Sequence, residues 1–320
     1  MRISRLFGPL LVGKSSPTAS LYFENACADW LTTDRVEKIA PTVFATDTTQ
    51  VIFRHNIRVP NGFSRPRTIY FMDDYWRPDP NLPLKYRIKS ALVEQRAARL
   101  FMPKSRAIVV SSVPLAEQAK QEFPNIPVHK IAPFWSEPLA DLSHFDSSTL
   151  EICFLGAQSH ARDLRLIIPA ISVVLQQFPQ AWFSLSAGHM LPANLAQHPQ
   201  IRRIPATGWE QYRREIIRHR FHIALYPLLD GKFNVARSLN KLTEHAVVGA
   251  ATLCSDTWLS GTDRVIATSN SEAQWVQKLC DLARDRARQK AVAQANLTAV
   301  NASNLADAQR QLWAGLLWPK

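Results

Sequence analysis

Short apolar runs and longer amphipathic stretches alternate along the chain. The apolar runs, each the length of one strand, occupy residues 42–45, 50–54, 68–72, 107–112, 126–133, 151–156, 181–185, 223–226, 251–254 and 264–267, and residues 201–204 form a further predicted strand. Apolar residues recur at helical spacing in 84–101, 114–122, 162–178, 212–218, 236–248, 272–305 and 305–318. Most runs lack the polar alternation of a half-exposed strand, which is typical of parallel strands covered on both faces. The pattern therefore predicts an α/β protein with parallel sheets and helices on their faces.

The length of the chain indicates two domains. Its 320 residues would fill two domains of about 150 residues each. Residues 135–148 contain Pro138 and the pair Ser147–Ser148 and show no strand or helix pattern, which favours a linker. We predict an N-terminal domain over 1–134, a C-terminal domain over 149–303, and a final helix within 304–320.

The charge balance restricts the choice of partners. The formal net charge is +12 at pH 7 and the sequence pI is about 9.8. Nucleic acid, an anionic membrane surface and acidic sugar-phosphate ligands all fit such a charge. The chain has no zinc-finger spacing, RNP aromatic signature or long basic arm, so we expect no nucleic-acid partner and keep a basic nucleic-acid binder as a rival interpretation.

Cysteine spacing and hydropathy indicate the compartment. Cys27, Cys153, Cys254 and Cys280 are widely spaced and form no CxxC pair, which predicts buried free thiols in a reducing cytosol and no bound metal. No apolar stretch approaches the ~18 residues of a membrane-spanning helix. The N-terminal apolar segment is short and interrupted, which is unlike a signal peptide. We expect a cytoplasmic protein.

The stretch 221–256 is predicted to form a strand, a loop, a helix and a second strand. Asn234 or Ser238 would cap the helix at its start, and Gly249 would end it. Such a unit forms ligand crevices at the carboxyl ends of parallel strands.

Three charged residues of the predicted helix would share one face. Arg237, Lys241 and Glu244 are spaced by four and then three residues, and neighbours at these spacings meet on a helix. Two cations near a helix N-terminus suit a diphosphate, and a carboxylate one turn further could accept hydroxyls of a sugar. The alternative is a solvated ladder of surface ion pairs.

The second half opens with another strand that ends in a glycine. Gly156 would let a ligand approach the backbone closely. Arg162 and Arg165 would stand at the start of the next helix, where positive charge is unfavourable unless an anion neutralises it. This placement also implies an anionic ligand.

Acidic and basic residues follow two strands of the first half. Asp73 and Asp74 come after the run 68–72, and Arg54 and His55 come after the run 50–54. Side chains at strand ends often form sites. The alternatives are a helix cap or solvated carboxylates for the aspartates, and a structural role for His55, although a histidine can titrate near neutral pH.

A glycine-rich segment near the N-terminus satisfies a phosphate-loop pattern formally. The segment from Gly8 to Ser15 fits G-x(4)-G-K-[ST], with Lys14 as its lysine. Pro9 and the apolar residues after it make a poor phosphate cradle, and Pro17 would break the expected helix. A P-loop NTPase is therefore a weak rival.

Several of these segments together resemble group-1 (family 4-like) glycosyltransferases of the GT-B fold. Residues 233–256 resemble the donor-binding pattern F-N-x-x-K-S-x-x-K-x-x-E-x-x-x-x-G-x-P-V-V-x-S-D. Residues 154–164 are similar to F-L-G-x-x-S-H-x-x-D-L, and residues 68–76 and 107–115 resemble two strands of the first domain. Ala236 stands where many relatives have a first glutamate, which in those relatives contacts the sugar ring.

The resemblance implies a fold and a reaction. Two doubly wound Rossmann-like domains would face each other across a cleft, and the C-terminal helix would cross back to the first domain. Taken alone, that helix could equally be a core or dimer helix. The implied reaction is sugar transfer from a nucleoside-diphosphate-sugar to a glycan or lipid-linked acceptor in surface polysaccharide biosynthesis, retaining and without a metal or other cofactor.

The resemblance also implies roles for single residues. Arg237 and Lys241 would stabilise the diphosphate leaving group, and His55, Asp73 and Asp74 would face the acceptor. Further donor-binding positions are Gly156, His160, Arg162, Asn234, Ser238 and Glu244. A basic surface would dock on the inner membrane face. The alternative is an inactive, glycosyltransferase-like protein that binds a nucleotide sugar or polysaccharide.

Overall fold

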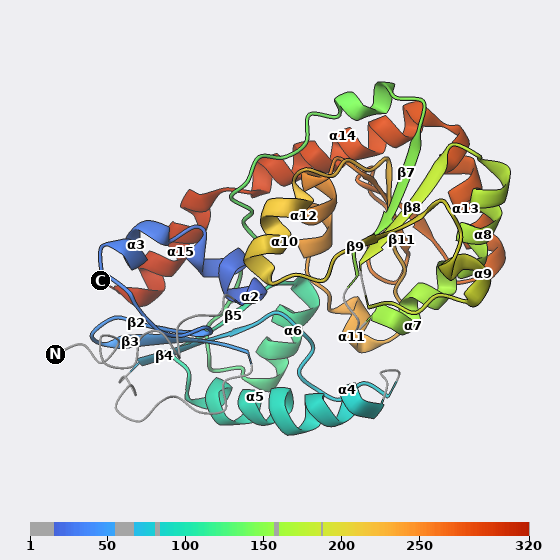
Figure 1. The fold of residues 1–320 in the computed structure, drawn as a ribbon. Coiled ribbons are helices and arrows are strands. Elements are labelled where there is room, and N and C mark those ends of the chain that lie inside the picture. Colours follow the sequence, from blue (N-terminus) through green and yellow to red (C-terminus); the bar gives the residue numbers. More distant parts are fainter. Residues whose placement is uncertain (1–15, 55–66, 81–83, 157–159, 187, 320) are drawn as a thin grey trace. The chain divides into compact units, whose positions relative to one another are not determined.

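The computed structural model describes residues 16–54, 67–80, 84–156, 160–186 and 188–319. The segment from Gly8 to Ser15 and His55 lie outside these residues. The chain forms two compact units (Figure 1). The first comprises Met1–Ser136, Ala236–Leu239 and Asn304–Lys320, and the second comprises Glu137–Val235 and Asn240–Ser303.

The first unit is built on a six-stranded sheet whose strands run in chain order. The strands are β1 (Glu37–Ala40), β2 (Val43–Ala45), β3 (Thr49–Phe53), β4 (Arg67–Met72), β5 (Ala107–Val110) and β6 (Val128–Lys130). Strands β3 to β6 pair in parallel, whereas β1, β2 and β3 pair antiparallel. The sequence pattern missed β1, because its polar, half-buried residues resemble a loop and not a buried run.

Helices cover both faces of the first sheet (Figure 1). They are α2 (Pro17–Ala19), η1 (Ser20–Glu24), α3 (Ala28–Thr32), α4 (Leu84–Lys89), η2 (Ser90–Glu94), α5 (Gln95–Phe101), η3 (Met102–Lys104), α6 (Val113–Glu122) and α15 (Ala306–Leu317). Residues of α5 and α6 form one core with Ile52, Tyr70 and Ile108. On the other face, Trp313 of α15 packs against Phe23 and Phe53.

The second unit has a parallel sheet in the order β12-β11-β10-β7-β8-β9. Its strands are β7 (Leu150–Phe154), β8 (Ala181–Ser186), β9 (Ile201–Ile204), β10 (Ile223–Tyr226), β11 (Ala251–Ser255) and β12 (Val265–Thr268). The strand order reverses between β7 and β10, which pair directly. Ligands of doubly wound sheets bind outside the carboxyl ends of the strands at such a switch point.

Helices of the second unit flank this sheet (Figure 1). They are η4 (Ser143–Asp146), α7 (Ala161–Leu164), η6 (Arg165–Ile167), α8 (Ile168–Gln177), α9 (Ala193–Ala196), α10 (Trp209–Ile216), α11 (Lys232–Val235), α12 (Asn240–Val247), α13 (Glu272–Arg284) and α14 (Arg286–Ser303). The predicted helix 162–178 is divided, and Pro169 stands at the start of α8. The predicted helix 272–305 is divided at Asp285.

Helix α12 begins at Asn240 and not near Ala236 as the sequence predicted. The four residues before it belong to the first unit, where Ala236 is part of the buried core. The predicted end is confirmed. Gly249 has a φ of +74°, and the bonds Gly249 N–H to Ala246 O (3.2 Å) and Ala250 N–H to His245 O (2.8 Å) form a Schellman cap.

The four cysteines are all buried and free, as their spacing predicted. Burial raises the pKa of the Cys27 and Cys254 thiols to about 12. These thiols are therefore protonated and inert near neutral pH.

Candidate functional site

In the second unit, Lys241 and Glu244 form a buried ion pair at the end of β7. Both residues lie on α12, three positions apart, and the Lys241 Nζ also donates a hydrogen bond of 2.6 Å to the Leu155 carbonyl. The side chains of Lys241 and Glu244 are 20% and 8% exposed. Lys241 and Glu244 therefore lie on one face of α12, as the sequence predicted. The alternative of a solvated ladder fails here because the pair is withdrawn from water.

Tyr212 completes this cluster, and the sequence pattern did not single it out. Its hydroxyl, from α10, donates a hydrogen bond to Oε1 of Glu244, while Lys241 holds Oε2. Burial raises the pKa of Tyr212, and the negative charge of Glu244 raises it further, so this hydroxyl stays a donor. Only the fold brings α10 to α12, so sequence spacing carries no signal for this contact.

A buried histidine of α12 contacts the neighbouring strand β11. His245 is buried, and its Nδ1 is 2.9 Å from Oγ1 of Thr252 on β11. Burial lowers the pKa of His245 to about 3, and the charge of Lys241 lowers it further. His245 is therefore neutral at physiological pH, and the positive charge at this end of α12 belongs to Lys241.

The loops after β7 and β10 are joined through Asp163. Its Oδ2 lies 2.8 Å from Nδ1 of His160, and its Oδ1 accepts a bond of 2.9 Å from the Leu229 N–H and one of 3.4 Å from Nδ2 of Asn234. All three of His160, Asp163 and Asn234 are buried. The predicted donor-binding residues His160 and Asn234 thus share one carboxylate at the switch point of the sheet.

Gly156 has no room for a side chain. A Cβ atom at this position would lie 2.4 Å from the ring of Phe154, and the Gly156 carbonyl lies 2.7 Å from Nε2 of the buried His189. The requirement for glycine follows from packing within the loop. A close approach of ligand stays a prediction.

The anion expected beside Arg162 stays a prediction. Arg162 lies in the first turn of α7, which continues through a 3₁₀ turn into α8. Arg162 and Arg165 are both exposed.

In the first unit, Asp73 and Asp74 form a cluster with Arg54. Arg54 follows β3 and the aspartates follow β4, the neighbouring parallel strand, so their side chains meet at one edge of the sheet. The Arg54 Nε lies 3.0 Å from Oδ1 of Asp73, and its Nη2 pairs with Asp74. The side chains of the two aspartates are 7% and 12% exposed. They are therefore neither helix caps nor solvated loop carboxylates.

Two further groups join this cluster that the sequence did not indicate. Thr18 Oγ1 donates a bond of 2.7 Å to Oδ2 of Asp73, and Oε1 of Glu94 lies 3.8 Å from Nη2 of Arg54. The sequence contained one signal for Glu94, because it is a charged residue on the apolar side of the helical pattern at 84–101. Burial raises the pKa of Asp73, while the charge of Arg54 opposes this rise.

Arg237 belongs to the same cluster. Its Nη1 lies 3.0 Å from Oδ1 of Asp74, and its side chain is 16% exposed. The segment is fixed by a 2.8 Å bond from Ser112 Oγ to the Ala236 carbonyl, and Ser238 shares a hydrogen bond with the buried Tyr22 hydroxyl. Arg237 and Ser238 therefore lie outside α12, contrary to the predicted single helical face.

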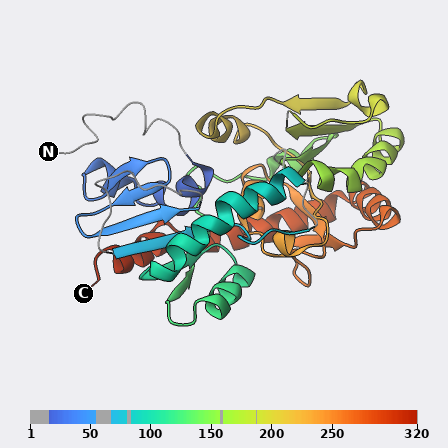
Figure 2. The same cartoon turned by 90° about the horizontal axis from the view of Figure 1, so that it is seen from below.

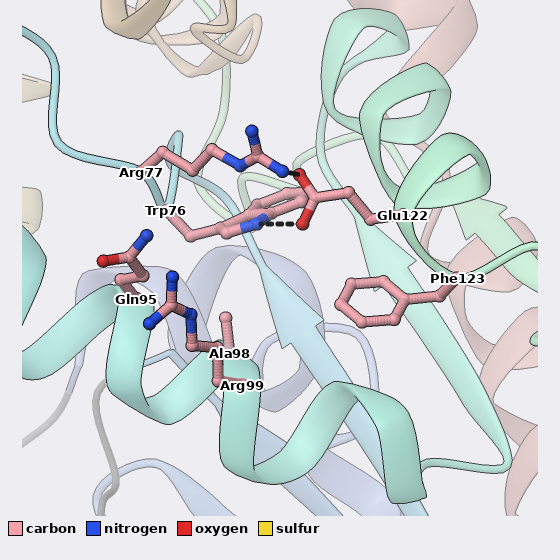
Figure 3. A pocket seen from close by; sticks show the side chains of 7 residues that line it. All are labelled: Trp76, Arg77, Gln95, Ala98, Arg99, Glu122 and Phe123. Atoms are coloured by element: carbon pink, nitrogen blue, oxygen red, sulfur yellow. Dashed lines mark hydrogen bonds and ion pairs between the residues drawn. The ribbon is translucent and has the colours of Figure 1, made fainter.

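A hollow of about 250 Å³ is lined in part by Trp76 and Arg77, which follow the aspartates in the sequence (Figure 3). Its lining comprises Trp76, Arg77, Gln95, Ala98, Arg99, Glu122 and Phe123. Figure 3 shows Glu122 between Trp76 and Arg77, from which it accepts bonds of 3.2 and 2.9 Å. This carboxylate is already paired within the protein. No group of three His, Cys, Asp or Glu side chains that could hold a metal occurs among the described residues.

Comparisons with known proteins agree on the fold. No protein-family model matches the chain, and no curated protein sequence does either. Among solved structures, a variant of S. aureus TarM in complex with fondaparinux, α-GlcNAc-glycerol and UDP superimposes with a TM-score of 0.59 at 8% identity, covering 79% of this chain and 51% of TarM. Anabaena HepE with UDP and glucose gives 0.57 at 9% identity, covering 79% and 72%.

The pneumococcal O-GlcNAc transferase GtfA, in complex with UDP and GlcNAc, gives a TM-score of 0.52 at 10% identity, covering 78% of this chain and 52% of GtfA. This chain has the GT-B fold. It spans about half the length of TarM and of GtfA. The expected fold class, two Rossmann-like units of the GT-B type, is confirmed, and at these identities the likeness is one of fold.

Proposed function

We propose that the protein is a glycosyltransferase that moves a sugar from a nucleoside-diphosphate-sugar to a glycan or lipid-linked acceptor. The observation that carries the proposal is the Lys241–Glu244 pair at the switch point of a GT-B sheet. A cation and a carboxylate there suit a diphosphate followed by ribose hydroxyls. The TarM, HepE and GtfA structures were each solved with UDP, which supports a uridine-type donor.

In the proposed reaction the bond between the sugar and the diphosphate breaks, and the acceptor hydroxyl forms a new bond to the same sugar carbon. Lys241 and Arg237 would stabilise the negative charge that develops on the diphosphate, an effect worth ~10²–10³ in rate for one donor. Four positions of chain separate the two residues, so covalent geometry alone keeps their Cα atoms within about 14 Å. Glu244 would bind ribose.

The acceptor would be oriented by the carboxylates of the first unit. Asp73 is the stronger candidate, because burial raises its pKa and a carboxylate with raised proton affinity is a better acceptor of the hydroxyl proton. Asp74 and His55 would assist. We propose that the anomeric configuration is retained and that no metal is needed. NMR of the product would show its anomeric configuration. Turnover measured in excess chelator would show whether a metal is needed.

The test of the function is binding followed by turnover. We expect UDP or a related nucleoside diphosphate to raise the melting temperature of the protein, and Glu244→Ala to weaken this binding. Lys241→Ala should lower turnover with mixed glycan acceptors by ~10²–10³. Unchanged nucleotide affinity in Glu244→Ala would show that the donor site lies elsewhere. Arg214→Ala, on the exposed side of α10, is the matched charge control.

A second candidate function is favoured by one observation. Ala236 occupies the place of the first glutamate of the resembling family, and it is buried in the core of the first unit. A nucleotide-sugar or polysaccharide-binding protein without activity would need no such glutamate. Nucleotide binding without turnover across donors and acceptors would favour this alternative. In either case we propose a cytoplasmic protein that associates peripherally with the inner membrane face during surface polysaccharide biosynthesis.

A further inference from the structure

One helical segment of the first unit exposes a row of large apolar side chains. Residues 84–101 form α4, η2 and α5 without interruption (Figure 2). Leu84, Ile88, Leu92 and Leu100 are 67%, 49%, 63% and 41% exposed. These four and Arg96, which is also exposed, recur at every fourth position, and together we name them the outer stripe.

The wide turn η2 keeps the outer stripe straight. Four residues of an α-helix advance by about 40° beyond one full turn, so a regular helix would rotate the stripe by about 160° between its ends. A π turn contains one residue more than an α-helical turn, which removes about 100° of this rotation. The turn at Ser90–Glu94 thus returns Arg96 and Leu100 to the side of Leu84.

The inward side of the same helix is fixed to the protein. Ala97 and Ala98 are buried in the core, and Glu94 is buried 3.8 Å from Arg54. Glu94 is the only acidic residue in 84–101, whereas five of these residues are Lys or Arg. The outer side therefore carries no negative charge from this segment.

We propose that the outer stripe docks on the surface of an anionic phospholipid bilayer. Arg87 and Arg99 are exposed beside the stripe and Arg96 within it, so cations flank the apolar side chains. A narrow apolar face bordered by arginines is the pattern of a helix that lies in the membrane interface. Among the residues that the structure describes, no helix is long and apolar enough to cross a membrane.

Charge complementarity selects a bilayer over a second copy of the chain. In a symmetric dimer the same patch meets itself, and the arginines of the two copies would face each other. Like charges at such contacts oppose association. An anionic lipid surface instead neutralises each arginine, and the leucines enter the interface between headgroups and acyl chains.

The proposal rests on the membrane association included in the proposed function. Vesicle flotation tests it without any donor or acceptor, so its failure would leave the proposed sugar transfer standing. We expect the protein to float with phosphatidylcholine vesicles that contain phosphatidylglycerol and to stay behind with phosphatidylcholine alone. The triple variant Leu84→Ser, Ile88→Ser, Leu92→Ser should lower the partition coefficient at least about a hundredfold. Arg96→Glu changes the charge by two units, and each unit contributes about fivefold, so this variant should lower the partition coefficient about twentyfold.

Matched controls use exposed residues elsewhere. Met190→Ser and Leu305→Ser remove apolar side chains that are 92% and 52% exposed, and Arg214→Glu reverses an exposed charge. All three should float as the native protein does. Equal binding to neutral vesicles, or flotation of the triple variant, would overturn the proposal. So would a dimer in light scattering that the triple variant abolishes.

A site-specific probe adds a direct readout. The native cysteines are buried, so an environment-sensitive dye will label Ile88→Cys selectively. Its emission should shift to the blue with phosphatidylglycerol vesicles, while the same dye at Met190→Cys should not respond. An unchanged spectrum at position 88 would exclude insertion of the outer stripe.

Discussion

Removing the positive charge of Lys241 should destabilise the second unit unless the charge of Glu244 is removed with it. In Lys241→Met, Glu244 keeps the hydrogen bond from Tyr212 but loses its ion-pair partner inside the protein. Breaking a buried ion pair from one side costs ~3–5 kcal/mol. Because one carboxylate oxygen stays satisfied, we expect a loss near the lower limit, about 3 kcal/mol.

The double variant Lys241→Met, Glu244→Gln separates stability from binding. It keeps the side-chain volumes and the Tyr212 contact but leaves no buried charge, so its free energy of unfolding should return to within about 1 kcal/mol of the native value. The coupling energy from the cycle should therefore exceed about 2 kcal/mol. Urea unfolding of the native protein, Lys241→Met, Glu244→Gln and the double variant gives these values. Calorimetry with UDP should show that the double variant, although folded, does not bind.

Two results would refute this reasoning. A double variant as unstable as Lys241→Met would mean that the pair does not hold the carboxylate in place. A double variant that binds UDP with native affinity would mean that the pair is structural and that the donor site lies elsewhere. Either result is visible in the same two measurements.

Three further predictions concern the second unit. The pKa of His245 is lowered to about 3, so between pH 6.5 and 3 this residue binds fewer protons in the folded state than in the unfolded state. Its contribution to stability should be full above about pH 6.5 and fall by about 1.4 kcal/mol per pH unit below it, and His245→Gln should reduce the slope measured by urea unfolding, with His222 accounting for part of the slope that is left. Gly249→Ala should cost at least about 2 kcal/mol, since the φ of Gly249 is +74° and the new Cβ would lie 2.7 Å from His144. Gly208→Ala has no atom within 4 Å of the new Cβ and should cost less than about 1 kcal/mol, through the poorer N-cap of α10 alone. Tyr212→Phe should lower the free energy of unfolding by about 1.5–3 kcal/mol, because the hydrogen bond to Glu244 is lost. Tyr75→Phe in the first unit is its control, and equal melting temperatures of the two variants would contradict the assigned bond.

The buried strands could be predicted from the sequence because their signal is local. The run at 223–226 coincides with β10, whose four residues are all buried, since continuous apolar residues need burial on both sides. The cap at Gly249 was also predictable, because a left-handed φ requires a residue without a Cβ. Strand β1 was not predictable, because an antiparallel edge strand with polar residues carries no apolar run.

The side-chain partners of the site could not be predicted, because they depend on contacts between distant segments. Tyr212 reaches Glu244 across 32 positions, and Thr18 reaches Asp73 across 55. Neither spacing corresponds to a helix or strand repeat. Residue types at strand ends indicated where charged groups gather, and the fold alone determined which groups pair.

The segment between Ala236 and Asn240 changes what the shared spacing of Arg237 and Lys241 means. The two residues are four apart, which on one helix would make them neighbours with one role. The chain is not helical between them, and each cation is bound to a carboxylate of its own unit, Arg237 to Asp74 and Lys241 to Glu244. Charge removal should therefore act separately at the two positions, and their effects on stability should add because they share no partner. An effect on nucleotide affinity that is non-additive, while stability stays additive, would be the evidence that one diphosphate contacts both.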